Sequence, residues 1–146
     1  MKLGTRTRYS ARAMVDLALN YENGNGIVPV KEISSRQQVS PKYLEHLLAS
    51  LRSAGLVRSV RGAKGGHTLA RPPDEINLRE IYHVFEGVEG FVECTTSPEL
   101  CDRTDGCVTR EVWVQMYEAC MEILESTTLA DLAHCARIKQ SDSLTA

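Results

Sequence analysis

The stretch SPKYLEHLLASLRSAGLVRSVRGAKGGHTLA, residues 40–70, predicts a helix that leads directly into a β-hairpin. Ser40 is a favourable N-cap, and Pro41 takes the first helical position, where its missing N–H costs nothing. Gly55 is a typical helix terminator. Between these ends runs one apolar stripe at helical spacing, made of Tyr43, Leu44, Leu47, Leu48 and Leu51.

The hairpin consists of the strand-like runs LVRSV and HTLA on either side of RGAKGG. RGAKGGH could also be a phosphate-binding loop, but such loops lead into a helix and this one leads into a strand. A shorter helix is expected over residues 30–37, so the order is helix, tight turn, helix and basic hairpin. This order favours a winged helix-turn-helix over an ordinary helical hairpin. The second helix would then enter the major groove of DNA, and the wing would reach phosphates or the minor groove.

Candidate DNA contacts follow from this arrangement, and the expected partner is a double-stranded DNA operator. They comprise Ser40, Lys42, Glu45, His46 and Arg52 on the helix, with Arg58, Arg61 and Lys64 on the hairpin. The arginines and the lysine of the hairpin, together with Arg52, are expected to act mainly through phosphates.

Charge is distributed unevenly along the 146 residues, although the net charge is only −2. Residues 1–71 carry 12 Lys/Arg against 4 Asp/Glu, whereas residues 72–125 carry 3 against 13. A basic half joined to an acidic half is typical of a polyanion-binding end, although charge runs are often only solvated surface. The polar, basic start MKLGTRTRYS and the lack of a long apolar run predict a cytoplasmic protein with reduced thiols and no membrane partner.

The remaining segments read as helices. One is expected over residues 7–22, and another over INLREIYHVFEG, with Asn77 and Glu80 in capping-box spacing. A long helix follows Cys107, and its wide apolar stripe predicts a two-fold helix–helix seam more readily than the core of a single chain. The seam residues are Trp113, Met116, Cys120 and Ile123, with Cys120 as a small buried apolar side chain. The fold class is therefore mainly α with a small β-hairpin.

Three parts are expected: a winged helix-turn-helix DNA-binding domain over residues 1–73, a cysteine loop with the dimerisation helix over 74–133, and a flexible tail over 134–146. A short helix over STTLADLA is expected before the tail.

The loop CTTSPELCDRTDGC places Cys94, Cys101 and Cys107 within fourteen residues. Clustered thiols in a reducing compartment favour metal binding, and soft thiolates select zinc or an iron–sulfur cluster. The spacing lacks the paired Cys-x-x-Cys of common zinc sites, and unrelated surface cysteines are the weaker alternative. A thiol-redox enzyme is disfavoured, because no Cys-x-x-Cys, nucleotide loop or His-assisted nucleophile is evident.

Several features together resemble one family. They are the basic first helix with Arg8-Tyr9 and Ala13-Met14, the stretch YLEHLLASLRSAGLVRSVRGAKGG, the three loop cysteines, the long helix and TLADL. The family is the bacterial Rrf-two family of winged-helix transcription regulators. The resemblance covers residues 1 to about 133 and is closest in kind to the regulators of iron–sulfur cluster assembly. It implies a homodimer, not an enzyme, whose DNA affinity or site choice is set by an iron–sulfur cluster on the three loop cysteines. It also implies that Ser40, Lys42, Glu45 and His46 face bases and that Arg61 enters the minor groove.

The fourth cluster ligand is where this chain departs from the family. Family members use a histidine three residues after the last cysteine or a carboxylate near position 8 of the partner's first helix. Here these positions are Arg110 and Arg8, and guanidinium offers no lone pair. The remaining candidates are His83, His134, Cys135, Asp102, Asp105, a residue of the partner, a water or a small thiol. A [2Fe-2S] or a [4Fe-4S] cluster, a nitric oxide- or iron-responsive repressor, and a zinc-stabilised repressor without a sensing role all stay open.

Overall fold

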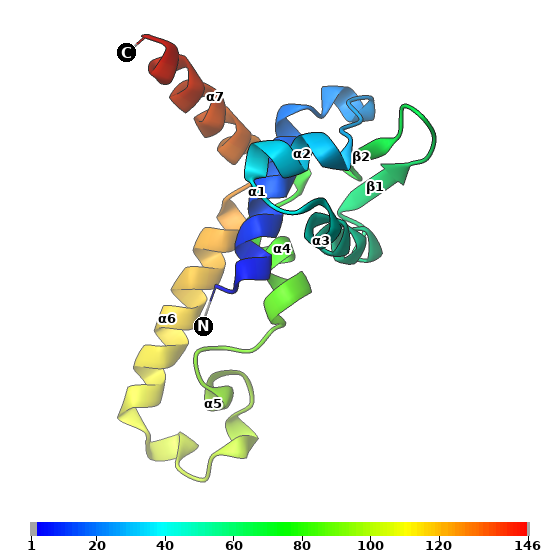
Figure 1. The fold of residues 1–146 in the computed structure, drawn as a ribbon. Helices are drawn as coiled ribbons and strands as arrows, with labels where there is room; N and C mark the ends of the chain where they lie inside the picture. Colours follow the sequence, from blue (N-terminus) through cyan, green and yellow to red (C-terminus); the bar gives the residue numbers. More distant parts are fainter. Residues whose placement is uncertain (1–2, 146) are drawn as a thin grey trace.

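The central element of the computed structural model, which describes residues 3–145, is helix α1 (Thr5–Leu19). Its inner face buries Ala13, Met14 and Leu17 completely, and helices from both halves of the chain pack against it (Figure 1). The helix begins and ends slightly earlier than predicted. The helix is capped by Asn20, and a tight 3₁₀ turn follows, η1 (Glu22–Gly24), in which Glu22 and Asn23 adopt positive φ angles.

The helix-turn-helix consists of α2 (Val30–Gln37) and α3 (Pro41–Ser53). Ser40 caps α3, because its hydroxyl oxygen accepts the backbone N–H of Tyr43 at 3.3 Å. Gly55 then leaves the helix at φ +75°, which is a left-handed conformation that glycine adopts without strain. The predicted cap, helix and terminator are all confirmed.

The wing follows directly as two antiparallel strands, β1 (Val57–Val60) and β2 (Gly66–Leu69). Their register pairs Ser59 with His67, and Leu69 with Val57. Leu69 is buried in the core, whereas the connecting tip is exposed to solvent. This two-stranded sheet completes the predicted mainly helical fold with a small hairpin.

A buried carboxylate joins α1 to the helix-turn-helix. Both oxygens of Asp16 accept from the guanidinium of Arg36 in α2, at 2.8 and 2.9 Å, and Gln37 donates to the same carboxylate at 3.0 Å. The bidentate geometry and the burial of Asp16 make this a strong polar contact. It fixes the orientation of α2 on α1.

Helix α4 (Leu78–Glu86) follows the short 3₁₀ turn η2 (Pro73–Glu75). The predicted capping box is present, since Asn77 accepts from the backbone of Glu80 and Glu80 accepts from the backbone of Asn77. Ile76 and Ile81 are buried in the same core as Leu48 of α3. One hydrophobic core therefore continues across the predicted division at residues 73–74.

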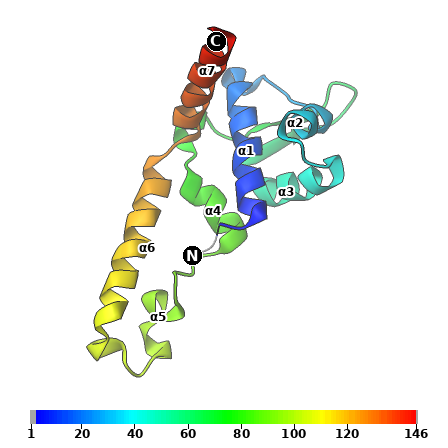
Figure 2. The same cartoon turned by 60° about the vertical axis from the view of Figure 1, so that its left-hand side comes forward.

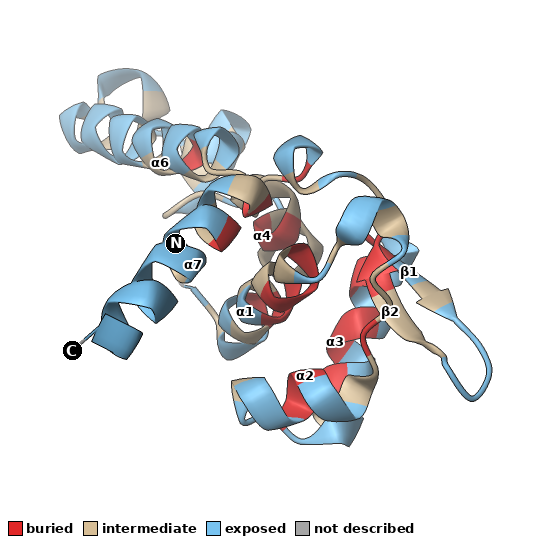
Figure 3. Ribbon diagram, turned by 90° about the horizontal axis from the view of Figure 1, so that it is seen from above, coloured by how far each residue is buried: buried red, intermediate tan, exposed pale blue. Residues whose placement is uncertain are grey.

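The cysteine loop and a long helix extend away from this core (Figures 1 and 2). The loop contains α5 (Glu93–Thr96) and two 3₁₀ turns, η3 (Pro98–Leu100) and η4 (Thr104–Gly106), before α6 (Val108–Ser126) begins. Figure 3 shows that buried residues concentrate in the body around α1, whereas α6 is exposed over most of its length.

The prediction of a short last helix is wrong in its extent. Helix α7 runs over Leu129–Thr145 without a break, through the segment that was expected to form a tail. Its first two turns bury Leu129 and Ala133 against the core, and the following residues include good helix formers such as Arg137 and Lys139. Within residues 3–145, no helix has the length and apolarity that a membrane crossing requires.

Candidate nucleic-acid interface and cysteine loop

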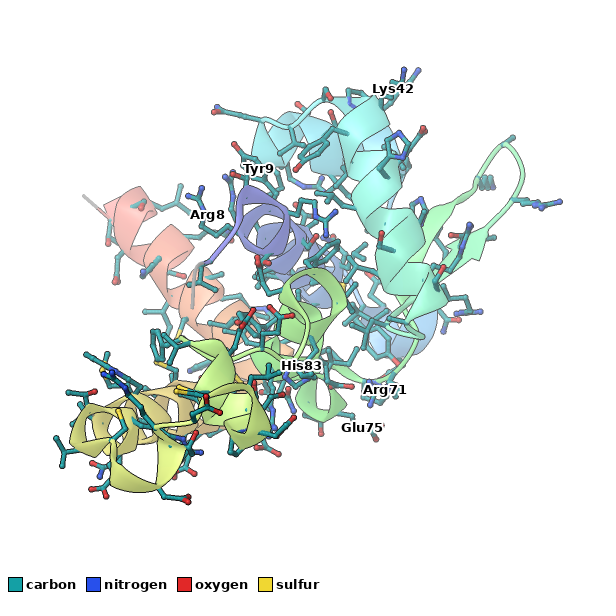
Figure 4. All side chains as sticks on the ribbon, turned by 90° about the horizontal axis from the view of Figure 1, so that it is seen from below. Arg8, Tyr9, Lys42, Arg71, Glu75 and His83 are labelled. Carbon is teal, nitrogen blue, oxygen red and sulfur yellow. The ribbon has the colours of Figure 1, made fainter. Side chains whose placement is uncertain are left out.

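The outer face of α3 carries the predicted base contacts. Lys42, Glu45 and His46 are all exposed, and Ser40 lies at the start of the helix. Lys42 projects away from the body, on the opposite side of the view from the cysteine loop (Figure 4). The buried leucines of α3 hold this face outward, so one helix supplies both the core and the exposed surface.

The basic residues of the wing occupy two different positions. Arg61 and Lys64 lie exposed at the tip, where they are accessible to a polyanion. Arg58 instead donates to the backbone carbonyl of Gly24 at 2.9 Å and thereby ties the wing to the turn η1. Arg52, at the end of α3, donates to the hydroxyl of Ser59 at 3.4 Å. The sequence predicted phosphate contacts for Arg52, Arg58, Arg61 and Lys64. In the structure, Arg58 and Arg52 each donate to a group of the protein itself.

The three loop cysteines are free thiols and lie half-buried on consecutive short elements. Cys94 lies in α5, Cys101 follows η3, and Cys107 is the N-cap of α6. Three thiols on one polar loop could supply three of the four ligands that a zinc ion or an iron–sulfur cluster takes. In the conformation described for residues 3–145, no three His, Cys, Asp or Glu side chains are gathered closely enough to hold a metal ion. The donor chemistry fits a cluster, but the loop would have to close around it.

Two neighbours of Cys107 favour its thiolate form. The hydroxyl of Thr109 lies 3.3 Å from the Cys107 sulfur, and this hydrogen bond is the main reason that the pKa of Cys107 is lowered. The backbone N–H of Arg110 lowers the pKa further. Because the thiolate is the metal-binding form, this environment prepares Cys107 as a ligand.

Arg110 stands where the resemblance implied a histidine ligand, and it has a structural contact instead. Its Nε donates to the backbone carbonyl of Cys94 at 2.8 Å, which links the start of α6 to the first loop cysteine. Arg8, at the other substituted position, is exposed and donates to Thr5 within its own helix.

The fold restricts which of the other candidates can be the fourth ligand. His134 and Cys135 lie on α7, beyond the far end of α6 from Cys107 (Figure 2). The 19 residues of α6 span about 28 Å at roughly 1.5 Å per residue, so these two side chains of the same protomer cannot reach the loop. His83 lies on α4 with its Nε2 buried. The acids of the loop, Asp102 and Asp105, are exposed beside the cysteines.

The apolar stripe of α6 divides into two faces. Tyr117, Met121 and Leu124 turn toward the body, where Met121 is buried and the Tyr117 hydroxyl donates to the carbonyl of Val88 at 3.1 Å. The predicted seam residues Trp113, Met116 and Ile123 remain on the surface, with Trp113 38% and Ile123 64% exposed. Cys120 is half-buried between the two faces. Large apolar side chains in a row on an exposed helix are typical of a protein–protein contact.

Sequence reasoning missed Glu86, the last residue of α4 before the cysteine loop. Its carboxylate accepts the backbone N–H of Gly4 at 2.8 Å and the hydroxyl of Thr7, so it caps the start of α1. No local sequence signal could reveal this contact, because the partners are about 80 residues apart. Glu86 thus connects the start of the cysteine loop to the central helix α1.

Comparisons with known proteins agree with this arrangement. The Rrf2 family, described as an iron-dependent transcriptional regulator, matches residues 3–135. Protein rrf2 of Nitratidesulfovibrio vulgaris is 38% identical over 138 residues, which cover 94% of this chain and 91% of that protein. The solved structure of CymR (YrzC), the global cysteine regulator of B. subtilis, superposes with a TM-score of 0.79 at 37% identity, covering 92% of this chain and 97% of that one.

The structure of T. potens IscR is also similar, with a TM-score of 0.74 and 41% identity over 93% of this chain and 88% of that one. The predicted fold class and the assignment as a regulator rather than an enzyme are therefore confirmed. This chain belongs to the Rrf2 family of winged-helix transcriptional regulators.

Proposed function

We propose that the protein is a cytoplasmic homodimeric transcription regulator whose DNA affinity or site choice is controlled by an iron–sulfur cluster. Cys94, Cys101 and Cys107 would hold the cluster, and the regulated genes would include those of iron–sulfur cluster assembly. The observation that carries the proposal is the presence of three free, half-buried thiols on one loop of a family member that is 41% identical to an IscR.

A cluster bound there would supply a redox-sensitive and nitric oxide-sensitive group that is lost when iron is scarce. The chain itself holds the loop at both ends. Arg110 ties Cys94 to α6, and Glu86 ties the start of the loop to α1. Closure of the loop would therefore act on the first turn of α1, the helix on which α2 is fixed through Asp16 and Arg36. This path supports a coupling between the cysteine loop and α3.

The DNA-binding part of the proposal assigns base contacts to the exposed start of α3 and phosphate or minor-groove contacts to the wing. Symmetric operators are read by two recognition helices about one helical turn apart, which requires a dimer. The exposed apolar face of α6 with Trp113, Met116 and Ile123 supports this dimer. Each protomer would contribute one α3 and one wing.

A second candidate is a regulator of cysteine metabolism that holds no cluster. It is favoured by the likeness to the solved structure of CymR, the global cysteine regulator of B. subtilis. A zinc-stabilised repressor is the third alternative, since thiolates also suit zinc.

The decisive experiment is purification without oxygen followed by iron, sulfide and zinc analysis and a visible spectrum. A brown protein with iron and acid-labile sulfide supports the cluster, and a colourless protein with zinc supports the zinc-stabilised repressor. A colourless, metal-free protein that still binds DNA supports the cysteine regulator. DNA binding before and after removal of the cluster then tests whether the cluster controls it.

A further inference from the structure

An open cleft of about 570 Å³ separates the recognition helix α3 from the wing. One wall is the face of α3 with Glu45, Ala49 and Arg52, and the other is the hairpin with Ser59 and His67. His67 takes no part in the predicted DNA contacts, yet it is a half-buried imidazole in the middle of the DNA-binding surface.

Three polar side chains form a chain of contacts across this cleft. Ser59 and His67 are direct partners in the β-ladder, and the Ser59 hydroxyl lies 3.0 Å from Nδ1 of His67. Arg52 donates to the oxygen of the same hydroxyl at 3.4 Å. Guanidinium can only donate, so the Ser59 oxygen accepts from Arg52. When neutral His67 carries its ring proton on Nε2, the Ser59 O–H donates to Nδ1.

Protonation of His67 changes this chain. Nδ1 then donates to the Ser59 oxygen, and the Ser59 O–H turns toward the cleft. Arg52, Ser59 and His67 would then all present donors, two of them charged. Three adjacent donors are suited to an anion, and charged donors bind phosphate oxygens most strongly, although the carboxylate of Glu45 lines the same cleft.

The position of the cleft indicates which anion it would meet. With α3 in the major groove and the wing at the adjacent minor groove, the strand of phosphates that separates the grooves passes between them. We propose that the cleft seats this sugar–phosphate strand and that His67, in its protonated form, contacts a phosphate there together with Arg52 and Ser59. The inference rests on DNA binding by α3 and the wing but is independent of the cluster.

The charges around His67 set the direction of the pH effect. Burial lowers the pKa of His67, Arg52 lowers it further, and Glu45 opposes both. Lys31 of α2 is the other charged residue that lines the cleft. His67 is therefore neutral at pH 7 in the free protein, and a phosphate beside it favours uptake of a proton. DNA binding should tighten as the pH falls through the pKa of His67, by at most about tenfold per pH unit for each proton taken up.

The test uses the full-length protein and a fluorescein-labelled 30-base-pair duplex of random sequence, because phosphate contacts do not depend on sequence. Affinity is measured by anisotropy at pH 5.5 and pH 8, each over a range of salt concentrations. The variants are His67→Gln, His134→Gln as the matched control at an exposed histidine of α7, and Glu45→Gln. At pH 5.5 we expect His67→Gln to bind roughly three- to tenfold more weakly than wild type and to lower the log–log salt slope by about one per protomer.

At pH 8 the same variant should match the wild type in both affinity and salt slope, and His134→Gln should match the wild type at both pH values. An equal loss at both pH values would mean that His67 only supports the wing, which overturns the proposal. Loss of the pH effect in Glu45→Gln would mean that His67 acts by neutralising Glu45, which also overturns it. If the wild type binds no duplex at either pH, the proposed DNA binding itself is refuted. If the wild type and His67→Gln bind equally well at both pH values, only the phosphate contact of His67 in the cleft is refuted.

Discussion

The guanidinium Nε of Arg110 donates a hydrogen bond to the backbone carbonyl of Cys94 at 2.8 Å. This contact crosses the whole cysteine loop, from the first turn of α6 back to the first of the three thiols. Arg110 therefore stands where the resemblance implied a ligand, and guanidinium cannot be one. In the proposed cluster site, Arg110 would shape the loop and another group would take the fourth coordination position.

Removal of the Arg110 contact is expected to weaken the retention of the proposed cluster. Arg110→Ala should release a proposed cluster to a chelator about fivefold faster, because one hydrogen bond of about 1 kcal/mol no longer restrains Cys94. Arg110→Gln, which retains a donor, should restore part of the difference. Arg103→Ala changes an exposed arginine of the same loop and should match the wild type. Equal rates for Arg110→Ala and Arg103→Ala would contradict a role for this contact.

The three loop cysteines should behave alike and differently from Cys120. Cys94→Ala, Cys101→Ala and Cys107→Ala are each expected to abolish iron incorporation and leave a folded dimer, because the loop lies outside the core. Cys120→Ala should retain iron and lose about 1 kcal/mol of unfolding free energy, since only one small side chain is removed. Iron and sulfide content, with circular dichroism, measure both effects. Iron loss in Cys120→Ala together with iron retention in a loop variant would refute the ligand assignment.

Arg61 and Arg58 should differ although both belong to the wing. Arg61→Ala should weaken binding most at A·T-rich sites with a narrow minor groove and lower the salt slope by about one per protomer. Arg58→Ala should change the salt slope less and instead lower the unfolding free energy by about 1 kcal/mol, because its partner is the carbonyl of Gly24. Salt titrations and thermal unfolding of both variants provide the comparison. Wild-type binding that did not respond to salt would argue against phosphate contacts altogether.

Glu45 is expected to act as a filter on operator sequence. A carboxylate on the DNA-facing side of α3 is unfavourable except where it accepts from the amino group of a cytosine. Glu45→Ala should therefore leave the best operator nearly unchanged and tighten binding to sequences that the wild type rejects. Binding selections on randomised DNA with both proteins test this. Identical preferred sequences would show that Glu45 is only a solvated surface residue.

The exposed face of α6 should be required for dimerisation. Trp113→Asp or Ile123→Asp is expected to yield monomers, because each large apolar side chain contributes about 1.5–3 kcal/mol when it is buried. Glu118→Lys, on the acidic face of the same helix, should stay dimeric. Light scattering coupled to size-exclusion chromatography gives the mass directly. If both aspartate variants remained dimeric, the dimer interface would not lie on this face of α6.

The helix-turn-helix and the wing could be predicted from the sequence because each depends on neighbouring residues. The Ser40 cap, the leucine stripe of α3 and the Gly55 terminator are set by backbone hydrogen bonding and helical periodicity within a few residues. The capping box of Asn77 and Glu80 is equally local. The three loop cysteines could be identified in the same way, since they are close in the chain and the chemistry of thiolates limits what they bind.

Contacts between distant segments were decided only by the tertiary structure. Periodicity showed that Trp113 and Tyr117 lie one turn apart on one side of a helix, but only the packing of α6 determined that Tyr117 is partly covered and hydrogen-bonded to Val88 while Trp113 stays exposed. Packing against α1 likewise stabilises the first turns of α7, which continues to Thr145 instead of ending early. The partners of Arg110 and Arg58 depend on how the chain folds back on itself. A local pattern states which side chains need a partner, and only the assembled core determines which partner lies within reach.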